Sequence, residues 1–435
     1  MSKKNKKINV ITLGCSKNLV DSEVLLEQLI ANNLTVEHNS NNTDFDTVII
    51  NTCGFINDAK QESIDLILDY AKAKKQGIIN NLFVMGCLSE RYKDELKNEI
   101  PEVDEYFGSN NLKDILNSIG VDYKKELIGE RLLTTPKHYA YLKISEGCDR
   151  TCSYCAIPLM RGKHKSKTIE TVVAEAEFLV KQGVKELILI AQDLSYYGLD
   201  IYKKHKLPEL LTKLSDIKGV EWIRIHYTYP ANFPYAILDV MSEKDNVCNY
   251  LDIAFQHISD NMLNLMKRNI TKQETYDLIT RIRNTVPNIA IRTTLLVGHP
   301  GETEQDFEEL KQFVKNVRFD RLGVFTYSHE EDTYAYKNYE DNIPENVKQQ
   351  RSDEIMEIQR QISQELNSNK IGKQFNVIID RQEGDYYIGR TEFDSPEVDD
   401  EVLISKENNK IKIGDYYIVE ITSSDDYDLY AKFVH

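Results

Sequence analysis

The sequence predicts an α/β multidomain protein whose 435 residues form three domains in series. Strand-like and helix-like segments alternate up to residue 369, and the remainder contains only short strand-like segments separated by turns. A chain of this length exceeds a single ordinary hydrophobic core. We expect an N-terminal doubly wound parallel α/β domain at 1–125, a central partial (β/α)6 barrel at 134–367 and a small antiparallel β-barrel at 370–435.

The first domain is predicted from three apolar, β-branched strands, each followed by a helix with apolar residues at helical spacing. Near-continuous apolar strands between helices are typical of a parallel sheet that is covered on both faces. The polar segment at 32–44, NNLTVEHNSNNTD, is interpreted as a loop. The strands are INVITLGC, DTVIINTC and NLFVMGC, and the helices are NLVDSEVLLEQLIANN, DAKQESIDLILDYAKAKKQG and SERYKDELKNEI.

Three cysteines mark the ends of these strands. Cys15, Cys53 and Cys87 each stand at the C-terminal end of one strand and next to a glycine. In open α/β sheets ligands bind at the carboxyl ends of the strands, so we expect the three thiols to meet in space. The alternative is that they are three structural cysteines, which are common in apolar strands.

The central domain repeats a strand and a helix six times, which predicts an incomplete relative of the eight-unit barrel with its site at the C-terminal mouth. Trp222 and Cys248 are expected to pack in its core, and Thr303 is expected to begin a helix as its cap. The strands are YAYLKISEG, KELILIAQD, WIRIHYTYP, YLDIAFQH, IAIRTTLLVG and RLGVFTYS. The helices are TIETVVAEAEFLVKQG, LPELLTKLSDI, TKQETYDLITRIRNTV, TEQDFEELKQFVKNV and the segment 344–369.

A second group of cysteines follows the first strand of this barrel. Cys148, Cys152 and Cys155 fall within eight residues, and no fourth cysteine is nearby. A structural zinc site would need a fourth ligand, and the spacing to His164 is not a usual zinc arrangement. A 4Fe–4S cluster held by three cysteines keeps one iron open for a small molecule. The spacing therefore favours an iron–sulfur cluster with a bound cosubstrate.

The third domain is predicted from the hairpin FNVIIDRQEGDYYIGRTEF, which turns at 383–385, and from the strands DEVLISK, DYYIVEITSS and LYAKFVH. Residues 370–435 contain eight Lys or Arg and fifteen Asp or Glu, a net charge of −7. A barrel with this balance would repel nucleic-acid phosphates and attract a basic protein. A solvated acidic surface that binds nothing is the alternative.

The whole chain carries a net charge of −16 and seven cysteines. No run reaches the roughly eighteen apolar residues of a membrane helix, and the apolar run near the N-terminus is too short for a secretory signal. Two cysteine triads in such a chain suggest metal or redox chemistry rather than disulfides. We expect a cytoplasmic protein with no membrane partner.

The three-cysteine motif, with Tyr154 directly before its last cysteine, resembles the signature of the radical S-adenosylmethionine (SAM) superfamily. The order of the three domains, together with VGHPGETEQDF, LDIAFQHISDNMLNLMKR and AQDLSYYGLD, resembles the methylthiotransferases over nearly the whole chain. The resemblance implies two 4Fe–4S clusters, one held by Cys148, Cys152 and Cys155 and the other by Cys15, Cys53 and Cys87. It also implies SAM as cosubstrate, a C-terminal TRAM domain, hydrogen abstraction by a 5′-deoxyadenosyl radical, sulfur insertion and methylation.

The resemblance also suggests which residues contact SAM. Tyr154 is expected against the adenine, with ordinary loop packing as the alternative. Gln192 and Asp193 end the second barrel strand, where the superfamily contacts the methionine amine; a helix-capping aspartate is the alternative. Gly298 is expected near the cofactor.

Two further features bear on the expected site. The segment RGKHKSK could hold a carboxylate through Arg161 and Lys163, or could be a solvated loop. Ala254 and Phe255 stand where much of the family has Pro-Leu, which leaves the SAM contacts near them undefined.

Two branches of the family differ in substrate: one modifies an adenosine in tRNA and the other the β-carbon of an aspartate in small-subunit ribosomal protein S-twelve. TLGCSKNLVDSE, NTCGFINDAKQESID and GRTEFDSPEVDDEV resemble the ribosomal branch, and the acidic C-terminal barrel agrees with it. Its expected partners are ribosomal protein S-twelve or the small subunit, an electron donor and a sulfur donor, and direct tRNA binding is not expected. The alternatives are methylthiolation of tRNA and a non-catalytic, metal-bearing RNA-binding protein.

Overall fold

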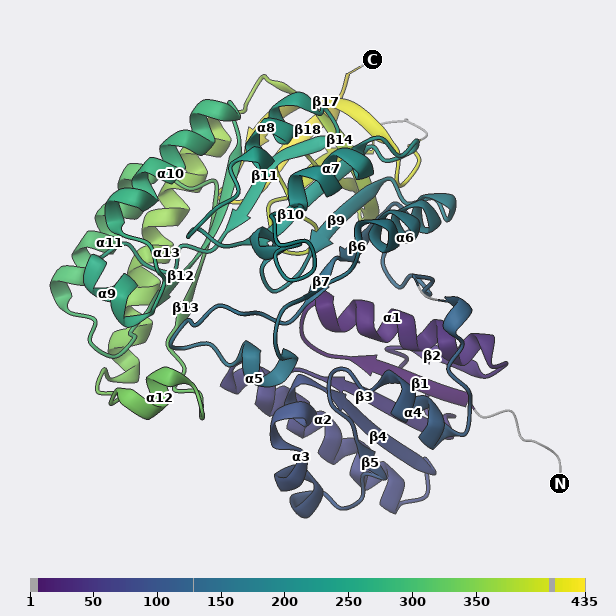
Figure 1. Cartoon of the computed structure of the whole chain (residues 1–435). Helices are drawn as coiled ribbons and strands as arrows, with labels where there is room; N and C mark the ends of the chain where they lie inside the picture. The colour runs from purple at the N-terminus through teal and green to yellow at the C-terminus, as the bar shows by residue number, and fades with distance from the viewer. Residues whose placement is uncertain (1–6, 128, 407–410, 435) are drawn as a thin grey trace. The chain divides into compact units, whose positions relative to one another are not determined.

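A computed structural model describes residues 7–127, 129–406 and 411–434 (Figure 1). The chain forms two compact units, and each is described by itself. The first unit consists of residues 1–135, 141–149 and 156–178, and the second of residues 136–140, 150–155 and 179–435.

The first unit contains a five-stranded sheet in the order β2-β1-β3-β4-β5, and every neighbouring pair is parallel. The chain turns back at β1, so that β2 lies on one side of it and β3 on the other, which is the doubly wound order. The fold class predicted for this domain is confirmed. The strands are β1 (Lys7–Thr12), β2 (Thr35–His38), β3 (Thr47–Thr52), β4 (Asn81–Gly86) and β5 (Glu105–Tyr106).

The interpretation of 32–44 as a loop was wrong, because this segment contains β2. Its four residues pair in register with β1, from Lys7 with Thr35 to Val10 with His38. All four are exposed or only half-buried, because β2 forms the edge of the sheet. An edge strand does not need the apolar pattern from which the inner strands were predicted.

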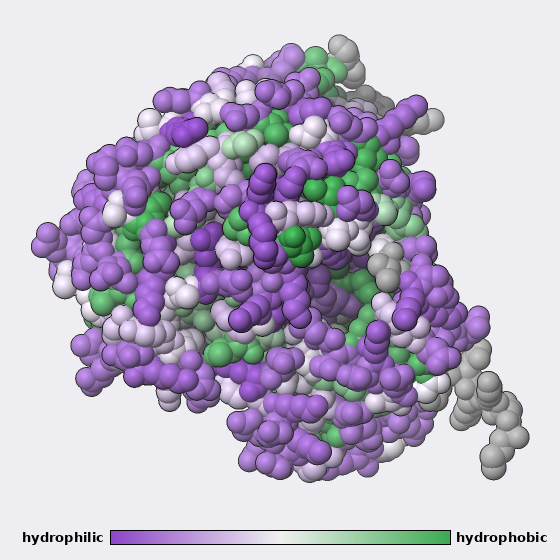
Figure 2. Space-filling model, viewed as in Figure 1, coloured by the Kyte–Doolittle hydropathy of each residue, from purple (hydrophilic) through white to green (hydrophobic). Residues whose placement is uncertain are grey.

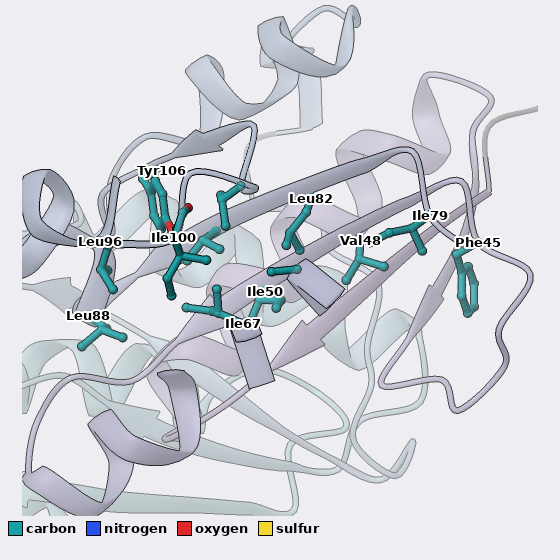
Figure 3. Close-up of a cluster of buried hydrophobic side chains, with 13 residues drawn as sticks. Phe45, Val48, Ile50, Ile67, Ile79, Leu82, Leu88, Leu96, Ile100 and Tyr106 are labelled. Carbon is teal, nitrogen blue, oxygen red and sulfur yellow. The ribbon is translucent and has the colours of Figure 1, made fainter. Parts of the chain in front are cut away.

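Helices cover both faces of this sheet. Leu25, Leu26 and Leu29 of α1 pack with α4 on one face, and Ile67 of α2 packs with α3 on the other. Figure 3 shows this second core, in which Ile67 lies beside Ile50 of β3. The helices are α1 (Ser16–Ala31), α2 (Asn57–Lys75), α3 (Cys87–Glu99) and α4 (Leu112–Ile119), followed by the 3-10 turn η1 (Lys125–Leu127).

An open sheet in the order β13-β12-β11-β10-β9-β6 contains the six strands expected of the partial barrel. The pairs from β9 to β13 are parallel, and each strand neighbours the next one along the chain. The predicted six-unit arrangement is therefore confirmed. The strands are β6 (Tyr139–Lys143), β9 (Glu186–Ile190), β10 (Trp222–Thr228), β11 (Val247–Ile253), β12 (Ala290–Val297) and β13 (Arg321–Thr326).

The long helices of this region lie where the sequence predicted them, and four short helices were not expected. Thr303 accepts a hydrogen bond from the Asp306 N–H and Asp306 reciprocates, so the predicted cap is present. The expected helices are α6 (Ile169–Lys181), α7 (Leu207–Ser215), α10 (Lys272–Thr285), α11 (Glu304–Val317) and α13 (Glu345–Ser368). The others are α5 (Ile157–Arg161), α8 (Ala236–Glu243), α9 (Asp260–Leu265) and α12 (Tyr334–Asn338), with the two-residue strands β7 (Ser145–Glu146) and β8 (Lys165–Ser166) and the turn η2 (Leu194–Tyr196).

The last five strands close into a barrel in the order β14-β15-β16-β18-β17. It was predicted to be antiparallel, and one pair departs from this: β16 and β18 are parallel. The reason is geometrical, since five strands that close on themselves cannot alternate in direction all the way round. The strands are β14 (Gln374–Glu383), β15 (Tyr386–Arg390), β16 (Val402–Ser405), β17 (Tyr416–Ser424) and β18 (Leu429–Phe433).

Within the second unit the barrel packs against the start of the parallel strands. Trp222 and Cys248 are buried here, as expected, beside Ile378 of β14. Glu186 is fully buried and accepts hydrogen bonds from Arg224 at 2.7 Å and from Arg390 at 2.8 Å. A buried carboxylate is tolerated when such donors surround it, and two arginines satisfy this one.

Some of the barrel's acidic residues also face this contact. Asp394 and Asp400 are buried and pair with Arg321, and Asp399 pairs with Arg292 at 3.3 Å. The net charge of −7 counted from the sequence therefore overstates the charge that this barrel offers to a partner.

The surface of the visible face is mainly hydrophilic, and hydrophobic residues form small separate patches on it (Figure 2). Among the described residues no helix is long and apolar enough to cross a membrane.

Acidification is expected to weaken the second unit through Asp380. Burial alone would raise the pKa of Asp380, but the Arg390 guanidinium and hydrogen bonds from His138 and Arg390 outweigh it and lower the pKa to about 2. The ionised carboxylate therefore contributes stability above pH ~4, and this contribution, about 2 kcal/mol, is lost as the pH falls from ~4 to ~2.

Urea unfolding followed by the fluorescence of Trp222, whose ring lies 4.9 Å from that of Tyr416 in β17, measures this. The Asp380→Asn variant should be less stable than the wild type at neutral pH, and its stability should change less between pH 4 and pH 2. If the free energy of unfolding fell equally with pH in both proteins between pH 4 and pH 2, Asp380 would not be the group whose lowered pKa stabilises the fold.

Candidate functional site

The first three cysteines stand on turns that touch one another. Cys15 follows β1, Cys53 follows β3 and Cys87 follows β4 as the first residue of α3. A Cβ on Gly14 would lie 2.7 Å from the Cys53 Cβ and 2.9 Å from its Sγ, and one on Gly54 would lie 2.8 Å from Leu88 of α3. Glycine is therefore required beside these cysteines, because any side chain would push the turns apart.

Asn18, on the first turn of α1, connects the three turns. Its buried side chain donates to the carbonyls of Leu13 at 2.8 Å and Thr52 at 3.1 Å, which lie just before Cys15 and Cys53. Its Oδ1 lies 3.9 Å from the Cys87 Sγ. One amide thus fixes the spacing of all three cysteine turns. Sequence reasoning noted this asparagine only as part of a motif.

Arg161, at the end of α5, reaches the same group of cysteines within the first unit. Its Nε donates to the Cys87 Sγ at 3.2 Å, its Nη1 donates to Asp21 at 2.7 Å, and its Nη2 donates to Asn18. The residue is 4% exposed and donates to the Asp21 carboxylate, so of the two alternatives given for Arg161 the solvated loop does not hold and a held carboxylate is present. Lys163, by contrast, is exposed to solvent.

Burial raises the pKa of Cys53 and raises the pKa of Cys87 to about 12, although the Arg161 guanidinium opposes the shift at both thiols. Without a metal these thiols keep their protons, and a metal must displace them. Two buried thiols with an arginine N–H on one sulfur form a donor set that suits an iron–sulfur cluster.

No group of three or more His, Cys, Asp or Glu side chains among residues 7–127, 129–406 and 411–434 surrounds the position of a single metal ion. A 4Fe–4S cluster differs from a single ion, because each cysteine binds a different iron and the sulfurs stand further apart.

The second group of cysteines lies in the segment after β7. In the first unit, the Cys148 N–H donates to the Gly162 carbonyl at 3.0 Å. In the second unit, Arg268 Nη1 donates to the Cys152 Sγ at 3.1 Å, and the Cys155 N–H donates to the Cys152 carbonyl at 3.2 Å. Cys152 thus has the same kind of buried arginine partner as Cys87.

Ser153, between the last two cysteines, anchors this segment in the second unit. Its N–H donates to the Met266 carbonyl at 3.0 Å, and its carbonyl accepts from the Ala335 N–H at 2.7 Å. Burial lowers the pKa of His299 to about 4, so this imidazole is neutral. Because its Nδ1–H donates to the Pro300 carbonyl, its Nε2 accepts a hydrogen bond from the Ser153 hydroxyl, with 3.1 Å between the two heavy atoms.

Tyr229 joins this site and was not singled out by sequence reasoning. Its ring lies between two guanidinium groups, with Arg150 and Arg268 each 4.1 Å from the ring centroid. Its hydroxyl lies 3.8 Å from the Cys152 Sγ. Two sequence signals were available: Tyr229 stands near the C-terminal end of the predicted strand WIRIHYTYP, and Arg268 ends the quoted stretch LDIAFQHISDNMLNLMKR.

The expected SAM contacts are placed as follows. Tyr154 packs beside Met262 and Met266, and its hydroxyl is 3.3 Å from Arg268. Asp193 is buried, caps η2 through the Ser195 N–H at 2.9 Å and accepts from Arg150 at 2.7 Å.

Gln192 lies two residues after the end of β9 and is half-buried. Gly298, after β12, has φ +75° and donates its N–H to Glu302 at 2.7 Å. The structural alternatives given for Tyr154 and Asp193 are thus present, and contact of these residues with SAM stays a prediction.

Three stretches of the chain match known protein families. Residues 142–314 match the Radical SAM superfamily, residues 7–108 match Uncharacterized protein family UPF0004, and residues 371–434 match the TRAM domain. The chain is 60% identical over 432 residues to "Ribosomal protein uS12 methylthiotransferase RimO" of Bacteroides thetaiotaomicron, covering 99% of both proteins. It is 59% identical to the protein of the same name from Phocaeicola vulgatus, covering 99% of this chain and 100% of that one.

The chain belongs to the RimO methylthiotransferase family. As a member of the RimO family and of the radical SAM superfamily, it is a transferase that uses an iron–sulfur cluster and SAM. The resemblance stated from the sequence is confirmed, and so is the fold class that it implied.

Solved structures agree on the fold. The radical S-adenosylmethionine methyltransferase TsrM from Kitasatospora setae, with cobalamin and a [4Fe-4S] cluster bound, superposes with a TM-score of 0.53 at 13% identity. The match covers 74% of this chain and 75% of that one, and it supports the architecture alone.

The environments of the first triad predict different thiol reactivities in the metal-free chain. Cys15 is exposed, whereas Cys53 and Cys87 are buried with raised pKa values. Iodoacetamide at pH 8 should modify Cys15 at least about tenfold faster than Cys87, because the thiolate is the reacting species. Peptide mass spectrometry over a time course measures these rates.

Cys248 provides an internal control, since burial also raises its pKa to about 12. It should react as slowly as Cys87, and all of these cysteines should react alike in the guanidinium-unfolded chain. Modification of Cys87 as fast as Cys15 in the folded chain would contradict the described burial.

Proposed function

We propose that this protein adds a methylthio group to the β-carbon of an aspartate in ribosomal protein S-twelve, which the names of its relatives give as uS12. The observation that carries the proposal is the 60% identity to a RimO protein over 99% of both chains. Identity over the full length includes all three predicted domains, at 1–125, 134–367 and 370–435, and not only the radical SAM region.

Two 4Fe–4S clusters are proposed as cofactors, with Cys148, Cys152 and Cys155 holding one and Cys15, Cys53 and Cys87 the other. The first, with SAM, would supply a 5′-deoxyadenosyl radical that takes hydrogen from an unactivated carbon. Support for the second comes from the contact between the three cysteine turns and from the arginine on the Cys87 sulfur. We propose Tyr154, Gln192, Asp193 and Gly298 as further SAM-binding residues.

Residues of this chain hold the backbone of each cysteine triad in place and donate hydrogen bonds to its sulfurs. Arg268 offers an N–H to Cys152, and the Tyr229 ring holds that guanidinium by a cation–π contact. Ser153 fixes the backbone between Cys152 and Cys155 by its three hydrogen bonds. In the first unit Asn18 performs the corresponding task for the turns of the other triad.

We propose the C-terminal barrel as the docking surface for the basic ribosomal protein. Several of its acids are buried in pairs with arginines, and among the described residues of the barrel four acids are exposed and can attract a basic protein over a distance. They are Glu383, Asp385, Glu397 and Asp425. The same charges disfavour direct tRNA binding.

The reaction further requires an electron donor and a sulfur donor. We place the protein in the cytoplasm, where its substrate and the small ribosomal subunit are, with no membrane partner.

Mass spectrometry of a strain that lacks this gene, beside its parent, tests the proposal. The methylthio group should disappear from ribosomal protein S-twelve, and the methylthio nucleosides of tRNA should stay at parental levels. Complementation with the wild-type gene should restore the modification, and complementation with Cys152→Ala should not. Loss from tRNA with an unchanged ribosomal protein would contradict the proposed substrate.

A further inference from the structure

Arg161 is a buried arginine of the first unit that donates to a cysteine sulfur, and the packing of the fold does not require this contact. The side chain is buried at the carboxyl edge of the sheet and uses all three nitrogens: Nε for the Cys87 sulfur, Nη1 for Asp21 and Nη2 for Asn18. Burying an arginine is costly unless its donors are satisfied. Here one of the partners is a sulfur of the proposed second cluster.

We propose that Arg161 is a positioning residue for that cluster. It donates an N–H to the Cys87 sulfur, and this hydrogen bond raises the reduction potential of the cluster. This inference rests on the proposed function, since it takes Cys87 to be a cluster ligand. A sulfur bonded to iron is a better hydrogen-bond acceptor than a neutral thiol, and hydrogen bonds to ligand sulfurs help to set cluster potentials.

The surroundings of Arg161 hold its Nε on the sulfur. The preceding residues of α5 pack against Cys87, since Ile157 and Met160 share a hydrophobic cluster with it. The Met160 carbonyl accepts the Ser109 hydroxyl at 2.8 Å, which fixes the last turn of α5. The guanidinium therefore has a defined position before any cluster is bound.

The charges around Arg161 balance one another. Asp21 accepts from both Arg161 and Lys143, and Glu146 accepts from Lys143 at 2.7 Å and from Arg161 at 3.3 Å. Two cations thus face two carboxylates, so the local N–H donor, rather than a net positive field, acts on the cluster. Removal of the arginine would also leave the two carboxylates undercompensated beside it, which shifts the potential in the same direction.

A structural role offers a competing explanation, in which Arg161 only attaches α5 to the sheet. Arg131 provides a matched control. It is also a buried arginine of the first unit, 1% exposed, and it faces Glu23 at 3.4 Å and Glu175 at 3.9 Å rather than a cysteine. Both Arg161→Gln and Arg131→Gln should destabilise the folded chain, but only Arg161→Gln should change the reduction potential of the cluster.

The test is a redox titration of the reconstituted full-length chain, followed by electron paramagnetic resonance. The signal of the N-terminal cluster is identified as the one that persists when Cys148, Cys152 and Cys155 are replaced by alanine. Arg161→Gln should disfavour the reduced cluster at least tenfold, a shift of about 59 mV to lower potential for one electron. Arg161→Lys should shift the potential less, because the ammonium keeps N–H donors and the charge that faces the two carboxylates. Arg131→Gln should leave the potential unchanged.

An unshifted potential in Arg161→Gln at wild-type iron content would overturn the inference, as would an equal shift in Arg131→Gln. If Arg161→Gln takes up no iron, Arg161→Lys decides: an intermediate shift supports the role, and a wild-type potential refutes it. If no signal persists when Cys148, Cys152 and Cys155 are replaced, the chain holds no second cluster and the proposed two-cluster assignment fails. An unshifted potential, by contrast, refutes only the role of Arg161.

Discussion

Three chain turns approach one another closely at one edge of a parallel sheet, and the proposed second cluster depends on this approach. Parallel strands all end at the same edge, so residues that follow successive strands meet there although dozens of residues separate them in the sequence. Gly14 and Gly54 allow the turns to touch, and Asn18 fixes their spacing through two backbone carbonyls. These short-range contacts define where the three sulfurs stand.

Electrostatics then distinguishes these sulfurs from ordinary buried thiols. Burial raises the pKa of Cys87 and that of Cys248 alike, yet only Cys87 receives an arginine N–H on its sulfur. Cys152 has an equivalent partner in Arg268. A buried arginine on the sulfur of a cysteine thus occurs in both triads, and it is the arrangement expected where a thiol gives way to a metal-bound thiolate.

The sequence allowed the six strands of the partial barrel and their long helices to be predicted, because inner strands and amphipathic helices carry strong hydrophobic periodicity. It did not reveal β2, whose edge position leaves it polar, or the parallel pairing of β16 with β18, which follows from barrel closure. Cysteines, glycines and their spacing indicated the candidate sites. The contacts of these cysteines with arginines escaped prediction, because they are made over long sequence separations: Arg161 is 74 residues from Cys87, and Arg268 is 116 residues from Cys152.

Iron and acid-labile sulfide analysis of the anaerobically reconstituted chain tests most directly whether the protein holds two separate clusters. The wild type should contain about eight irons and as many sulfides, and replacing either cysteine triad by alanine should leave about four. Four irons in the wild type, unchanged when Cys15, Cys53 and Cys87 are replaced, would show that the first triad holds no cluster and would contradict the account. Zinc without sulfide would contradict it for both triads.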